Sequence, residues 1–249
     1  MSALVICAPS FAVGVKDVRL MPISPLELQQ AILHTPLYSS KQEQLTLRAF
    51  NSGLSKIAYE QYTLLWKKVP NDGYANLRRG VAALRYWRYA TQPSVHEIPV
   101  GSQQDKSLYA VASSCLEKAS KLMPDSADAN AEYGFLLWQF GNRMSEGLTL
   151  IVKASSIEPA NATIHSILGD IYSNPTPGVY KPQKAASEIA TALHNDPSYA
   201  YPHYQLARLY MQEKKYSDAR NELKAYINLG NASTSQSPGV VFLELLIGK

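Results

Sequence analysis

The residues best suited to chemistry in this 249-residue chain are two cysteines and five histidines, and their spacing argues against a metal or catalytic site. Structural metal sites place such residues in close pairs, about two to five positions apart, so that both ligands reach one ion. The histidines here are scattered along the chain, at His34, His96, His165, His194 and His203. Cys115 has no histidine or carboxylate at a ligand or triad spacing. We therefore expect no metal site and a buried structural thiol at Cys115.

Other catalytic patterns are missing from the sequence as well. It contains no Gly-x-Ser-x-Gly elbow and no glycine-rich phosphate loop. The pair His96–Glu97 lies in a polar segment, residues 91–106, and two adjacent side chains do not make a catalytic constellation. The sequence predicts a protein that is not an enzyme and uses no cofactor. The alternative is an enzyme, or an accessory subunit of one, whose chemistry resides in residues 91–106.

A cluster of cations and aromatic rings between residues 66 and 89 offers a third kind of chemistry. Its cations are Lys67, Lys68, Arg78, Arg79, Arg85 and Arg88, and its rings are Trp66, Tyr74, Tyr86, Trp87 and Tyr89. Such a mixture can bind single-stranded nucleic acid or another anionic polymer. The alternative, which we favour, is that the rings form a helical core and the arginines extend from it to solvent. Nucleic acid is accordingly not an expected partner.

The composition is that of an ordinary globular chain, 46% hydrophobic and 18% charged, with a net charge of +4. It is too apolar for a chain disordered throughout, and its two cysteines are too few for a disulfide framework. No uncharged apolar run reaches the roughly 18 residues that a membrane-spanning helix needs. The length permits one large domain or two small ones, since a domain averages about 150 residues.

Internal repetition decides between these possibilities. Sets of small and apolar residues recur at steps of four, three and five, and four of the five sets end in proline. The sets are Ala58, Tyr62, Leu65 and Pro70; Ala112, Leu116, Ala119 and Pro124; Gly147, Ile151, Ala154 and Pro159; Ala185, Ile189, Ala192 and Pro197; and Ala219, Leu223, Tyr226 and Asn231. Steps of four and three place residues on one face of an α-helix, and proline ends the helix.

Each of these helices, which we call B helices, follows another helix with its own pattern, an A helix. Leu168-Gly169 precedes Tyr172, and Leu206-Ala207 precedes Tyr210. Tyr133-Gly134 and Gly80 carry looser versions of the same pattern. The chain therefore alternates A and B helices joined by short turns.

These residues resemble the tetratricopeptide repeat family, whose repeat is about 34 residues long. The distances between successive end positions are 54, 35, 38 and 34 residues, and the excess falls in two turn segments, residues 91–106 and 173–182. One departure from the family pattern is that His165 and His203 replace the aromatic residue expected early in the A helix. The resemblance implies an all-α fold, a right-handed α-solenoid of about five helix pairs at residues 39–233, with repeats at 39–72, 73–126, 127–161, 162–199 and 200–233.

The two ends of the chain fall outside the repeats. Residues 1–15 contain an uncharged apolar run of the length of a signal-peptide core, without a basic segment before it. We expect an export signal there; the alternative is an apolar segment packed on the first helix. Residues 16–38 hold three prolines and read as a linker or arm. Residues 234–249 are expected to form a terminal capping helix, or else an exposed apolar patch for self-association.

The resemblance also implies a binding surface, because tetratricopeptide repeats bind extended peptides along the concave groove lined by their A helices. The residues expected to face it are Arg85, Trp138, Gln139, Asp170, Asn174, Tyr201, Tyr204, Arg208 and Gln212. The positions at which one subset of the family grips a C-terminal carboxylate carry no lysine here, so that mode of binding is not expected. The sequence thus predicts a non-enzymatic scaffold that binds a protein or peptide partner and that acts outside the cytoplasm in a bacterial assembly, in the periplasm or cell envelope.

Overall fold

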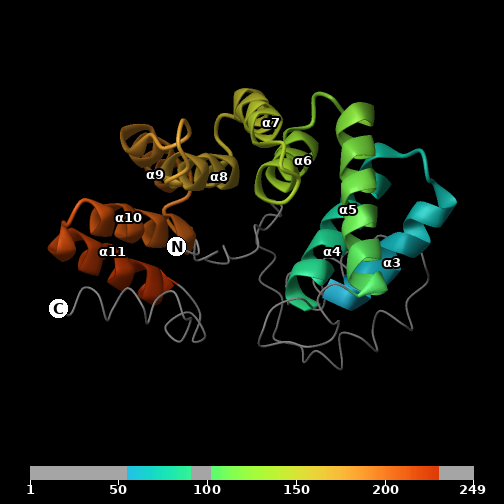
Figure 1. Cartoon of the computed structure of the whole chain (residues 1–249), viewed down its shortest axis with the longest axis horizontal. Coiled ribbons are helices and arrows are strands. Elements are labelled where there is room, and N and C mark those ends of the chain that lie inside the picture. Colours follow the sequence, from blue (N-terminus) through green and yellow to red (C-terminus); the bar gives the residue numbers. More distant parts are fainter. Residues whose placement is uncertain (1–54, 91–101, 230–249) are drawn as a thin grey trace. The chain divides into compact units, whose positions relative to one another are not determined.

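The structure is a computed structural model that describes residues 55–90 and 102–229. All regular structure in these residues is α-helical (Figure 1). The helices are α3 (Ser55–Lys68), α4 (Gly73–Ala90), α5 (Gln103–Leu122), α6 (Ala127–Gln139), α7 (Met144–Ile157), α8 (Ala162–Ser173), α9 (Pro182–Asn195), α10 (Ala200–Gln212) and α11 (Tyr216–Leu229). The described residues divide into two compact units, residues 55–90 with 102–147, and residues 148–229.

In the first unit each helix packs against the next along the chain, α3 on α4, α4 on α5 and α5 on α6. Leu116 and Leu136 lie fully buried in its core with Ala58. The helices α4 and α5 approach each other closely at Gly80, where an added Cβ would lie 2.8 Å from Cγ of Leu116. A small residue at this point therefore sets how closely the two helices pack.

The second unit repeats this construction. Its helices α8 and α9, α9 and α10, and α10 and α11 pack in pairs, and the A helices α8 and α10 also contact each other directly. At Gly169 an added Cβ would lie 2.6 Å from Cγ1 of Ile189, the counterpart of the contact at Gly80. Each unit is thus a stack of helix pairs, the construction of an α-solenoid, which confirms the predicted all-α fold.

Burial confirms the helix face that the spacing predicted. The first and second residues of the repeated sets are buried in the five B helices, at Ala58, Tyr62, Ala112, Leu116, Gly147, Ile151, Ala185, Ile189, Ala219 and Leu223. The third residues Leu65 and Tyr226 are only half-buried, whereas Ala119, Ala154 and Ala192 are fully buried.

The turns between repeats are held by polar side chains at one repeated position of the A helix. Nδ2 of Asn76 donates to the carbonyl oxygen of Pro70 at 3.0 Å, and Nδ2 of Asn130 donates to that of Pro124 at 2.9 Å. His165, at the same position, has Nε2 2.9 Å from the carbonyl oxygen of Pro159. These carbonyl groups lie just beyond the ends of α3, α5 and α7 and therefore lack a donor within a helix. Asn76, Asn130 and His165 thus each bond a carbonyl group of the turn before their helix, whereas His203 at the same position pairs with Glu222.

One predicted boundary was wrong. The segment 91–106 was expected to be a polar insertion throughout, but α5 begins at Gln103. The hydroxyl of Ser102 accepts from the backbone N–H of Asp105 at 3.1 Å and caps the helix. The first turn of α5 was interpreted as part of the insertion because its residues are polar. They are polar because their side chains face solvent, with the exception of the buried Asp105. The second predicted turn segment, residues 173–182, agrees with the structure, in which α8 ends at Ser173 and α9 begins at Pro182.

Several expectations concern residues that the structure does not describe. These are the candidate signal segment 1–15, the arm 16–38, the A helix of the first predicted repeat, the pair His96–Glu97, and the terminal segment 234–249. Among the described helices, none has the length and apolar character needed to cross a membrane.

Replacing Gly147 with alanine tests the close helix packing. Gly147 lies at the start of α7, where an added Cβ would lie 2.5 Å from the carbonyl oxygen of Gly134 and 2.7 Å from the backbone nitrogen of Trp138. Both atoms belong to backbone and cannot rotate away. We expect Gly147→Ala to lower the free energy of unfolding by about 1–3 kcal/mol, measured by urea denaturation. Ser156→Ala, on the exposed face of the same helix, should change it by no more than about 0.5 kcal/mol; equal effects would contradict this packing.

Candidate functional site

The residues predicted to face the groove fall in both units, and the structure brings most of those in the second unit together. Asp170, Tyr201, Tyr204 and Arg208 come from the neighbouring A helices α8 and α10. Asn174 and Gln212 lie at the C-terminal ends of the same helices. The members in the first unit are Arg85 on α4 and Trp138 and Gln139 on α6.

The centre of the second unit's site is the carboxylate of Asp170. Its Oδ2 accepts a hydrogen bond from the Tyr201 hydroxyl at 2.7 Å, and its Oδ1 lies 3.4 Å from NH1 of Arg208. The side chains of Asp170 and Arg208 are 15% and 23% exposed. Burial raises the pKa of Asp170, although Arg208 and the Tyr201 hydroxyl act in the opposite direction. Desolvation therefore outweighs the pairing at this carboxylate.

The two tyrosines of this site offer little surface to a partner. Tyr201 and Tyr204 are both about 5% exposed or less, and their rings stack with centroids 5.9 Å apart. Tyr204 also contacts the ring of Tyr226 on α11, at 5.2 Å between centroids. Their role is to hold α10 in place beneath the charged pair.

A buried polar pair that the sequence interpretation missed joins the same two helices. The Ser166 hydroxyl donates to Oε1 of Gln205 at 2.9 Å, and Nε2 of Gln205 donates to the Ser166 carbonyl at 2.7 Å. Both residues are buried. Their positions, four residues before Asp170 and three before Arg208, fix the rotation of each helix and hence the direction of the charged side chains.

The ends of the two A helices carry amide side chains with different roles. Oδ1 of Asn174 accepts from the backbone N–H and the hydroxyl of Thr176, so this side chain shapes the turn that follows α8. Gln212 is exposed and accepts from the Tyr180 hydroxyl at 3.3 Å through Oε1. Gln212 is thus the more accessible of the two.

The first unit contains a second partly buried charged group on neighbouring A helices. Burial raises the pKa of Glu132 on α6 to about 7, opposed by the charge of Arg85 on α4. Burial likewise lowers the pKa of Arg85 to about 10, with Glu132 opposing. Trp138 is half-buried, and its Nε1 has no hydrogen-bond partner within the described residues; Gln139 ends α6 and is also half-buried. The sequence pointed to Arg85 but not to Glu132.

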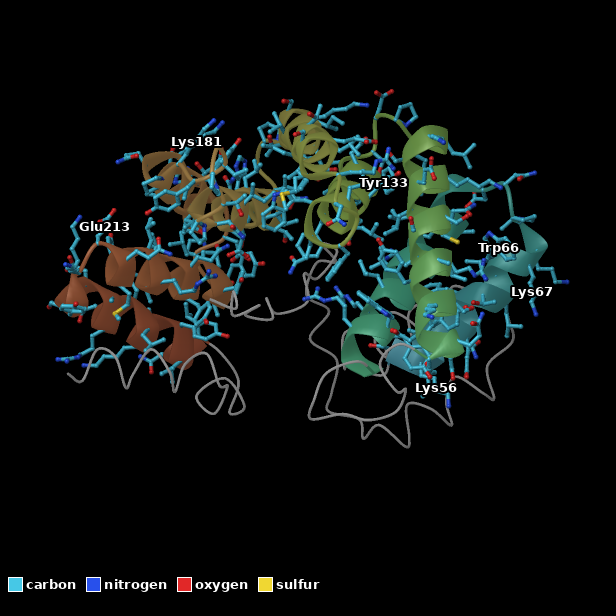
Figure 2. All side chains as sticks on the ribbon, viewed as in Figure 1. Lys56, Trp66, Lys67, Tyr133, Lys181 and Glu213 are labelled. Atoms are coloured by element: carbon cyan, nitrogen blue, oxygen red, sulfur yellow. The ribbon has the colours of Figure 1, made fainter. Side chains whose placement is uncertain are left out.

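Three cations of the basic-aromatic cluster at residues 66–89 have different surroundings in the structure. The guanidinium of Arg79 lies 4.0 Å from the centre of the Trp66 ring and donates to Thr63 at 3.3 Å. Arg88 instead lies over the Phe135 and Phe140 rings of the next repeat, and Lys67 points away from the end of α3 (Figure 2). These cations thus have different neighbours. Of the rings, Tyr86 is buried and Trp66 and Trp87 are half-buried, as expected of a helical core, whereas Tyr74 is exposed.

Cys115, His165 and His203 contact side chains of neighbouring helices. Cys115 is buried, burial raises the pKa of its thiol, and NH1 of Arg79 lies 3.6 Å from its Sγ. Nδ1 of His165 lies 2.7 Å from Glu188, and Nδ1 of His203 lies 2.7 Å from Glu222, so both pair an A helix with its own B helix. No three His, Cys, Asp or Glu side chains in the described part of the chain are grouped so that they could hold a metal ion.

Comparison with known proteins identifies the repeat. Residues 180–234 match the family model described as "Tetratricopeptide repeat". The search of curated proteins gave no match.

Solved structures show the same fold at low sequence identity. A tetratricopeptide-repeat protein of Thermus thermophilus is 18% identical with a TM-score of 0.57, over 75% of this chain and 89% of its own. PilF of Pseudomonas aeruginosa is 16% identical with a TM-score of 0.57, over 90% of this chain and 84% of its own. PilW, a widely conserved type IV pilus biogenesis factor, is 19% identical with a TM-score of 0.58, over 82% of this chain and 84% of its own.

The Glu132 carboxyl should make stability depend on pH. Its folded pKa of about 7 is above its ordinary value of 4.5, so the folded state binds the proton more tightly than the unfolded state does. The contribution of Glu132 to the free energy of unfolding should therefore be fully present below pH 4.5 and be lost as the pH rises through about 7, a change of about 3 kcal/mol at most.

Chemical denaturation of the full chain at several pH values measures this effect. We expect the stability difference between the wild type and Glu132→Gln to change across this window. Glu60→Gln, which removes an exposed carboxylate on α3, provides the control. Parallel curves for the wild type and Glu132→Gln would show that burial does not perturb Glu132.

Proposed function

We propose that this chain, whose residues 180–234 match the tetratricopeptide-repeat model, is a non-enzymatic scaffold that binds an extended segment of a partner protein on its A helices. The observation that carries this proposal is the group of polar side chains on the neighbouring helices α8 and α10. Asp170, Arg208 and Gln212 remain partly or fully exposed, whereas the rings beneath them are packed into the unit.

The chemistry of these side chains suits a peptide. An extended peptide backbone presents N–H donors and C=O acceptors. The side-chain amide of Gln212 can bond both, because it has an acceptor oxygen and an NH2 donor group. A guanidinium adds a charged contact, and arginine is among the residues that most often dominate binding energies. The helix pairs keep these groups at fixed separations, so a ligand does not have to order them.

In the first unit, we propose that Arg85, Trp138 and Gln139 form the corresponding surface on α4 and α6. Arg85 and Trp138 combine a charge with a large amphipathic ring, and all three side chains are half-buried. The charge of Glu132 also acts on Arg85, so a ligand would bind Arg85 in competition with this carboxyl.

We also propose that the protein is exported, to the periplasm or cell envelope, and serves an assembly there. The support is the apolar segment at residues 3–15 and the precedent of PilW, a type IV pilus biogenesis factor with the same fold.

A paired substitution on α10 tests partner binding. Arg208→Gln/Gln212→Ala removes one charge and one amide from the proposed surface without emptying the core. We expect peptides selected from a display library on the wild-type full chain to bind this variant at least about 10-fold more weakly, measured by calorimetry.

Lys224→Gln/Asn221→Ala is the matched control, since it removes the same two kinds of group from the exposed face of the B helix α11. It should bind as the wild type does. If the control loses as much affinity as the α10 variant, the A helices are not the binding face.

The proposed export can be tested on the mature protein. Cleavage after Ala12 would follow the small residues Ser10 and Ala12, so N-terminal sequencing from the native source should find Val13 as the first residue. A mature protein that begins at Met1 or Ser2 would contradict export by this signal.

A further inference from the structure

The guanidinium of Arg208 has more hydrogen-bonding capacity than the structure uses. An arginine carries five N–H donors in a planar fork. Among the described residues, its one hydrogen-bonded partner is Oδ1 of Asp170, at the long distance of 3.4 Å. Its other close neighbour is the ring of Tyr204, whose centre is 5.9 Å away and which accepts no conventional hydrogen bond.

Asp170 cannot easily move to improve this pairing. Its other oxygen is held by the short bond from the Tyr201 hydroxyl, and Tyr201 is buried on α10. A well-formed arginine–carboxylate pair has two parallel bonds of about 2.7–2.9 Å. The pair observed here has one long contact, so Arg208 is partly desolvated without a full partner.

We propose that Arg208 recognises an acidic side chain, Asp or Glu, of the extended segment that binds α8 and α10, and that Asp170 is an internal competitor for it. This inference rests on the proposed function and specifies the partner's chemistry. An incoming carboxylate is free to adopt the two-bond geometry that Asp170 does not reach. Asp170 lowers the affinity because its negative charge lies beside the one that the ligand brings.

The two sides of this competition predict opposite effects of two substitutions. Arg208→Gln removes the donor fork and should weaken the binding of acidic peptides by about 10-fold or more. Asp170→Asn removes the competing charge while its amide oxygen can still accept from Tyr201, and should strengthen that binding several-fold. A purely structural role for the pair would make both variants bind more weakly.

The experiment selects peptides of twelve residues from a random library on the wild-type full chain, and each selected peptide is then synthesised both with a blocked and with a free C-terminus. We expect an enriched Asp or Glu at one position of the selected peptides. Replacing that residue by Gln or Asn in the peptide should cost about 10-fold in affinity for the wild type and little for Arg208→Gln. Circular dichroism establishes that each variant is folded, and the peptide substitution requires no protein variant at all.

The possible results separate this inference from the function on which it rests. Failure of every peptide to bind above background would contradict the proposed function and this inference with it. Tight peptides with no acidic preference, or a loss of affinity in Asp170→Asn, would leave the scaffold function standing and overturn the role of Arg208. Peptides that bind only with a free C-terminus would overturn the assignment to an acidic side chain.

Discussion

The structure depends on the close approach of helices at small residues. At Gly80, Gly147 and Gly169 a neighbouring helix lies where a Cβ would have to be, and in the case of Gly147 the obstruction is backbone. Such contacts fix both the distance between two helices and their rotation about their own axes. The rotation is what matters for function: Asp170 follows Gly169 directly, so the contact that places the glycine against α9 turns the carboxylate toward α10.

The same packing partly removes charged side chains from water. The opposite charges beside them do not fully offset the loss of hydration. Desolvation is the largest influence on the pKa of Glu132, Arg85 and Asp170, larger than the attraction of the opposite charge in each case. Well-packed apolar residues of similar size commonly stabilise a fold as much or more than such groups do. Stability alone therefore does not account for their presence on the A helices of both units, whereas the proposed binding of a partner would.

Much of the fold could be predicted from the sequence because its signal is periodic. The B helices repeat steps of four and three, and prolines mark their ends, so burial of Ala112 or Ile189 follows from position alone. Contacts between repeats were harder to predict from the sequence. The Ser166–Gln205 pair, for example, spans 39 residues and joins positions that are not equivalent in the repeat. The burial of Tyr201 and Tyr204 could not be predicted either, since tyrosine is as common at the edge of a core as on a binding surface. Glu132 escaped notice because its perturbation comes from desolvation, which spacing does not reveal.

The central claim is that the A helices of this protein form its binding face. Chemical-shift mapping of the full chain, labelled with ¹⁵N and titrated with a peptide that it binds, tests this most directly. We expect the largest changes on α8 and α10, with the Nε–H signal of Arg208 among them. Changes concentrated instead on the exposed faces of the B helices α9 and α11 would contradict it.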